Sequence, residues 1–145
     1  MSGIIGVDLN QRSGVLGGTW NYTYTTTFLK NFNTSGASED ISYTGVGFKP
    51  SLINFVASSQ DNTSRSWGYD DGTTHLCLMT QFTLHTSATP GANTANMSIH
   101  IHDTATAGIK AIVKSMDADG FTLTYYDIGD PASTRNCSIM YTAFR

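Results

Sequence analysis

The stretch Met97-Ser-Ile-His-Ile-His102 alternates apolar and polar side chains without a break. Because successive side chains of a β-strand point to opposite faces, this spacing predicts a strand that buries its apolar residues and turns its polar residues to the other side. The same two-residue period returns over residues 121–126 and 137–144. Segments of this kind predict sheets with one buried face.

Five further segments are rich in aromatic and β-branched residues and predict strands; they cover residues 20–28, 41–46, 52–57, 75–85 and 109–113. The polar or Gly- and Pro-containing stretches between strands predict loops at 31–40, 58–72, 86–95 and 127–136. No segment shows a convincing helical period. We therefore expect an all-β fold of eight or nine strands, an antiparallel two-sheet β-sandwich that is jelly-roll-like.

Composition supports this fold and narrows the classes of function. The 145 residues include 15 Ser and 21 Thr, but charged residues make up only 13%. The net charge is -3 and the eight Lys and Arg residues are scattered, so we expect no nucleic-acid partner. No apolar run approaches the roughly 20 residues of a membrane span, and the first residues do not resemble a signal peptide. We therefore expect that the protein is made in a cytoplasm and does not insert into a membrane.

The two cysteines, Cys77 and Cys137, could form a disulfide or remain buried thiols. A reducing cytoplasm favours the thiols.

Residues 1–19 differ from the rest of the chain and precede a sandwich domain predicted over 20–145. They repeat the form Ser-Gly-aliphatic-aliphatic-Gly at 2–6 and 13–17. Aliphatic residues in so glycine-rich a setting cannot form a core of their own, which favours an arm that docks on a neighbouring protein. The residues expected to dock are Ile4, Ile5, Val7, Val15 and Leu16. The alternative is a terminus without a binding role.

Three signatures follow one another in the order Gly45-Val-Gly-Phe-Lys-Pro-Ser-Leu-Ile53, Trp67-Gly-Tyr-Asp-Asp-Gly72 and Asp117-Ala-Asp-Gly-Phe-Thr-Leu123. With the closing Ile139-Met-Tyr-Thr-Ala143 they resemble a β-sandwich module of bacteriophage tail and surface proteins, over residues 41–145. In outline the module is also similar to the H-type lectin fold. The resemblance implies a homotrimer located in the virion, with no catalytic residues.

The function expected from this resemblance is that of a virion structural protein, of the capsid-decoration, head-fibre or tail-appendage type. Its arm would bind other virion proteins of the capsid or tail. The alternative is a carbohydrate-binding module that recognises a host-surface glycan. We expect no enzyme and no cofactor, because the sequence lacks the motifs of serine hydrolases, phosphate-binding loops and zinc proteases.

Two groups of residues are candidates for binding. His100 and His102 would project from one strand face, and a three-fold axis would bring six imidazoles together as metal ligands. The alternative places them on a solvated or intersubunit face. Trp67 and Tyr69 could stack on sugar rings, with Asp70 and Asp71 accepting hydroxyl protons. The alternative for each aromatic residue is packing in the core.

Overall fold

The structure is a computed structural model that describes residues 23–31, 38–60, 63–80, 90–102, 104, 106–129 and 136–145, with only the backbone described for 90–95. Every regular element in this part of the chain is a strand. The prediction of an all-β, antiparallel two-sheet sandwich is confirmed. The arm predicted at 1–19 lies outside the described residues. No helix of the described part is long and apolar enough to cross a membrane.

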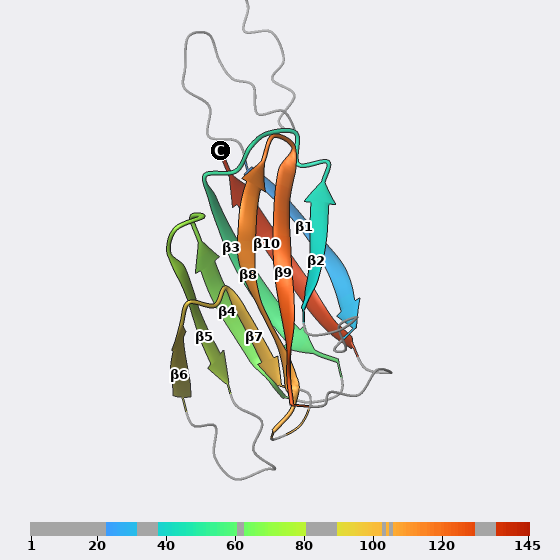
Figure 1. Ribbon diagram of the computed structural model, residues 1–145, viewed down its shortest axis with the longest axis vertical. Coiled ribbons are helices and arrows are strands. Elements are labelled where there is room, and N and C mark those ends of the chain that lie inside the picture. Colours follow the sequence, from blue (N-terminus) through green and yellow to red (C-terminus); the bar gives the residue numbers. More distant parts are fainter. Residues whose placement is uncertain are drawn as a thin grey trace, which may run out of the picture.

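In the described part of the chain, ten strands form two sheets (Figure 1). The six-stranded sheet contains, in spatial order, β1 (Thr23–Asn31), β10 (Asn136–Phe144), β3 (Leu52–Ser59), β4 (Arg65–Asp70), β5 (His75–Thr80) and β6 (Pro90–Ala95). The four-stranded sheet contains β2 (Glu39–Thr44), β9 (Gly120–Ile128), β8 (Gly108–Asp117) and β7 (Ile99–His102). All neighbouring strands are antiparallel, and Figure 1 shows β8 and β9 in front of β3 and β10.

The core lies between the sheets and follows the two-residue period of the sequence. On β7, Ile99 and Ile101 are both fully buried, as their alternation with polar residues predicts. Phe121 of β9 meets the edges of Phe55 and Tyr141 from the opposite sheet, with ring centroids 5.9 Å and 4.8 Å apart. Edge-to-face packing of this kind joins the two layers.

Two predicted loops are wrong in part. Residues 65–70 form β4 and residues 90–95 form β6, where loops were expected. The inward positions of β4 include Ser66 and Asp70, so the strand lacks the apolar alternation that marks its neighbours. Strand β6 begins at Pro90 and lies at the edge of its sheet, where a residue without an N–H is tolerated.

Two of the three sequence signatures contact each other. The Asp119 carboxylate accepts hydrogen bonds from the backbone N–H groups of Gly45 (3.1 Å) and Gly47 (2.6 Å). Both glycines have positive φ, at 86° and 84°, which other residues adopt with strain. The turn before β9 is thereby tied to the loop after β2. This contact gives the signatures a role in the fold, with no chemistry implied.

Candidate functional site

The outer face of the six-stranded sheet is the candidate site, and we call it the sheet face. It consists of the side chains that alternate with the buried residues of β1, β10, β3, β4 and β5. These are Thr23, Thr25, Thr27 and Leu29; Ser138, Met140, Thr142 and Phe144; Leu52, Asn54, Val56 and Ser58; Arg65, Trp67 and Tyr69; and Leu76, Leu78 and Thr80. Arg65 is the single charged residue in this described set.

An apolar row crosses the sheet face at right angles to the strands. Leu78 lies directly opposite Trp67, Trp67 opposite Val56, and Val56 opposite Met140. Trp67 is 48% exposed and Leu78 is 59% exposed. Side chains directly opposite on neighbouring strands lie about 5 Å apart and touch, so the row is continuous.

A second pair extends the apolar surface along β4 and β5. Tyr69 lies opposite Leu76, which is itself exposed. These two residues and the Trp67–Leu78 pair line an open hollow of about 410 Å³, with Gly68 and Cys77 at its floor. Because Gly68 and Cys77 face the interior, only the backbone of β4 and β5 forms the floor between the large outward side chains.

The opposite face of the sandwich is different in character. On the four-stranded sheet, Lys114 forms an ion pair with Asp40, and Lys110 lies over the ring of Tyr126, with 5.9 Å from Nζ to the centroid. The ion pair lowers the pKa of Asp40 and raises that of Lys114. The charges thus gather on one sheet and the exposed large apolar side chains on the other.

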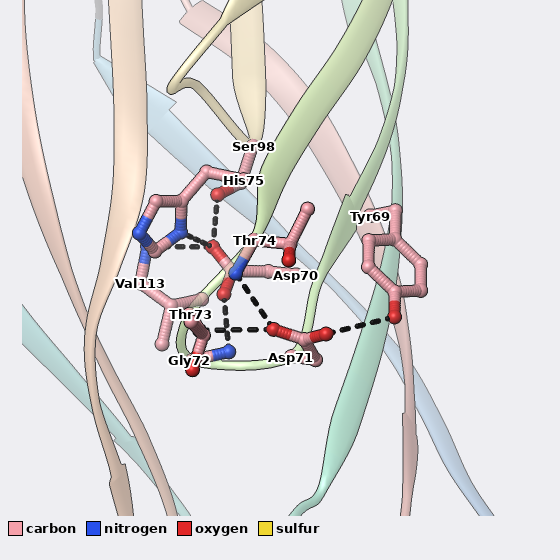
Figure 2. A network of polar contacts seen from close by, with 9 residues as sticks. All are labelled: Tyr69, Asp70, Asp71, Gly72, Thr73, Thr74, His75, Ser98 and Val113. Atoms are coloured by element: carbon pink, nitrogen blue, oxygen red, sulfur yellow. Dashed lines mark hydrogen bonds and ion pairs between the residues drawn. The ribbon is translucent and has the colours of Figure 1, made fainter.

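The structure separates the four residues predicted to bind a glycan. Trp67 and Tyr69 both point outward from β4 and lie on the sheet face. The Asp71 carboxylate accepts bonds from the Thr73 and Thr74 N–H groups and from the Tyr69 hydroxyl (3.1 Å). The backbone bonds lower the pKa of Asp71, while its carboxylate raises the pKa of Tyr69. Asp71 therefore shapes the turn between β4 and β5 (Figure 2).

Asp70 cannot contact a sugar, because it is fully buried on the inward side of β4. Its Oδ1 accepts a bond from the Gly72 N–H (2.8 Å), and its Oδ2 accepts one from the Val113 N–H of β8 (3.1 Å). The Ser98 hydroxyl also donates to Oδ2, and Nδ1 of His75 lies 2.7 Å from the same oxygen. Figure 2 shows these groups converging on Asp70: Val113 of β8, His75 of β5, Ser98 just before β7, and Gly72 of the turn. Asp70 joins the two sheets.

The Asp70 network lies at one end of a row of hydrogen bonds between the β4 and β7 segments. The His102 N–H donates to the Ser64 hydroxyl (3.0 Å), and the His100 N–H donates to the Ser66 hydroxyl (3.2 Å). Backbone donors of β7 thereby find acceptors across the sandwich. Since β7 is an edge strand of its sheet, these hydrogen bonds give partners to backbone N–H groups that would otherwise be unpaired.

His100 and His102 lie on one side of β7, as predicted, and their rings stack with centroids 4.9 Å apart. Both ring nitrogens of His100 are buried and have no hydrogen-bond partner among the described residues. Burial, together with His102 and Lys110 nearby, lowers the pKa of His100 to about 4. Within the described residues no three His, Cys, Asp or Glu side chains gather as a metal site requires. Ligation across a trimer axis would need these nitrogens to turn outward.

The remaining predicted residues have different outcomes. The docking-arm residues Ile4, Ile5, Val7, Val15 and Leu16 lie outside the described part of the chain. Cys77 and Cys137 are buried thiols, as predicted. Sequence analysis missed Leu76, Leu78 and Met140, because the run Leu76-Cys-Leu-Met79 is apolar on both faces and its pattern does not show which side is exposed.

No protein-family model matches the sequence, and neither a search of curated proteins nor a search of solved structures returned a match. The geometry of the sheet face and the sequence signatures are therefore the observations that bear on function.

Proposed function

We propose that this protein is a non-catalytic structural component of a bacteriophage virion, which assembles as a homotrimer and presents its sandwich at the particle surface. The observation that carries the assembly role is the sheet face, with its exposed apolar row and its single charge among the described residues. Exposed apolar patches rimmed by polar residues are typical of interaction sites. The virion location follows from the sequence signatures.

The arrangement around Asp70 supports a structural role over catalysis. In a nucleophilic triad the histidine lies between the serine and the acid. Here Ser98 and His75 both contact the same oxygen of Asp70. The carboxylate is also occupied by two backbone N–H groups, so its bonds hold strands together.

Residues 1–19 complete this proposal as the segment that attaches the sandwich to the capsid or tail. Deleting them should leave a folded trimer that no longer joins particles. Unchanged incorporation of the shortened chain would contradict the docking role of Ile4, Ile5, Val7, Val15 and Leu16.

The location of the chain in an imaged particle tests the proposal. Antibodies raised against the purified chain should label intact particles of the encoding phage in electron micrographs, and the chain should be present in purified particles. Particles that lack the chain would contradict the virion role. This outcome does not depend on how copies of the chain contact each other.

A glycan-binding module is the second candidate, favoured by the outward Trp67 and Tyr69 of β4. Two aromatic rings on one strand face can stack on successive sugar rings. In this role Trp67→Ala should abolish binding on a glycan array, while Trp20→Phe should leave it intact. Binding that survives Trp67→Ala would exclude the sheet face as the glycan site.

A further inference from the structure

We infer that the sheet face is the surface on which copies of this chain meet, so that the apolar rows of neighbouring copies form a shared core. This inference rests on the proposed assembly role and specifies the surface that performs it. The composition, the charge and the area of the sheet face all favour another copy of the same chain as the occupant.

The composition of the sheet face is that of an interface core. Trp67, Tyr69 and Met140 belong to the residue types enriched at such cores, where charged residues are depleted. Leu78 and Leu76 surround the aromatic pair and would exclude water from it. A sugar ring, in contrast, needs hydrogen-bonding partners around the aromatic stack. On the β5 side of the aromatic pair the leucine side chains offer none, and on the β3 side Asn54 lies opposite Tyr69.

Charge favours a copy of the same chain as the occupant. The chain carries a net charge of -3, and an interface without acidic groups avoids bringing like charges of two copies into direct contact. The described sheet face is such a surface, since Arg65 is its one charge, and the Arg65 guanidinium donates to the Ser64 carbonyl (2.9 Å). The four-stranded sheet exposes Asp40 and Lys114 instead. Burying those charges would carry a desolvation cost.

The area of the sheet face is sufficient for an interface. Its five described strands contain six to nine residues each. Strands about 4.8 Å apart that rise about 3.3 Å per residue give a face of roughly 20 Å by 25 Å, a projected area on the order of 500 Å². Side-chain relief raises the accessible area toward the roughly 800 Å² that each partner contributes to a stable interface.

Sedimentation velocity of the full chain and three variants tests the inference. Leu78→Lys and Leu76→Lys each place a charge on an exposed position of the sheet face, where the folded monomer accommodates it. Ile112→Lys is the matched control, since Ile112 is a partly exposed aliphatic residue of the four-stranded sheet. We expect the wild type and Ile112→Lys to sediment as the same oligomer. Both leucine variants should be folded monomers, with dissociation constants raised at least tenfold.

Three outcomes would overturn the inference. If Leu78→Lys and Leu76→Lys remain oligomers like the wild type, copies meet elsewhere, and the proposed virion role is unaffected. If Ile112→Lys dissociates as they do, the effect is not specific to the sheet face. If the wild type is a monomer at all concentrations, there is no self-association, and particle labelling decides the virion role independently. Circular dichroism confirms that each variant is folded; a variant that unfolds is replaced by Met140→Lys on the same face.

Discussion

Trp67 on β4 lies directly opposite Leu78 on β5, and both side chains point away from the core. Their positions follow from the inward positions of the same strands, because Ser66, Gly68 and Cys77 all face the interior. On β4 the usual arrangement is reversed: small and polar residues lie inside, and large aromatic residues lie outside. The inward residues contact β7, which leaves the outward rings available for a partner.

Gly68 of β4 lies very close to the backbone of Ser98, the residue before β7. A methyl group at Gly68 would lie 1.6 Å from the Ser98 carbonyl oxygen, a backbone atom that cannot move without moving β7. We expect Gly68→Ala to lower the free energy of unfolding by about 3 kcal/mol or more. Gly47→Ala is the comparison variant. A methyl group at Gly47 would meet no neighbouring atom, so its cost is that of placing alanine at a positive φ, about 1–2 kcal/mol. Urea unfolding measures the free energy of unfolding of both variants. Equal losses of stability would contradict the close approach of Gly68 to Ser98.

Asp70 and Asp71 are neighbours with different expected contributions to stability. Asp70→Ala leaves the Val113 N–H group and the Ser98 hydroxyl without their acceptor in a buried site, and it also removes the acceptor of the Gly72 N–H group in the turn. We expect a loss of about 3–5 kcal/mol. Asp71→Ala removes an exposed acceptor of two turn N–H groups and should cost about 1 kcal/mol. Thermal unfolding at one protein concentration tests this order, and a larger loss for Asp71→Ala would contradict it.

His100 should make the protein less stable in mild acid. Its pKa falls from 6.5 to about 4 on folding, mainly through burial. Between these values the unfolded state binds the proton and the folded state does not, so stability decreases as pH falls from 6.5 to 4. Allowing for partial exposure of the ring, the decrease is about 1–2 kcal/mol. His100→Gln should flatten this part of the pH–stability curve. An unchanged curve in the variant would show that another group is responsible.

Cys77 and Cys137 should not react with thiol reagents in the folded protein. Both are buried, and burial raises the pKa of Cys137 to about 12, so the reactive thiolate is scarce at neutral pH. They lie on β5 and β10, which are separated by three strand spacings, so the two residues are at least about 14 Å apart, too far for a disulfide. A chromogenic disulfide reagent should detect two thiols after denaturation and none before. Rapid reaction of the native chain would contradict their burial.

The fold was predictable where one sheet face is apolar. The alternation of residues 97–102 and 137–144 indicated both the strand and its buried side, and Ile99 and Ile139 are fully buried as expected. Strand β4 was not predictable in this way, because its inward Ser66 and Asp70 are polar. They are stabilised by partners on β7 and β8 that lie at least 28 positions away in the sequence. A pattern within one strand carries no information about such contacts.

The candidate site was predictable only in part for the same reason. Trp67 and Tyr69 were named from their residue type, and their spacing of two residues correctly implies a shared face. The two-residue spacing does not show whether that face is buried or exposed. Leu78 joins them only through the pairing of β5 with β4, which depends on strand register. Exposed leucines are therefore visible in the structure alone.

The accessibility of Trp67 is the most direct test of the shared core. Trp20→Phe leaves Trp67 as the only tryptophan of the chain. Acrylamide quenching of its fluorescence should be weak at high protein concentration, where the rows of neighbouring copies cover the ring, and should become stronger on dilution to the monomer. Strong quenching that is the same at every concentration, from a chain that sediments as an oligomer, would show that the sheet face stays exposed and would contradict the account.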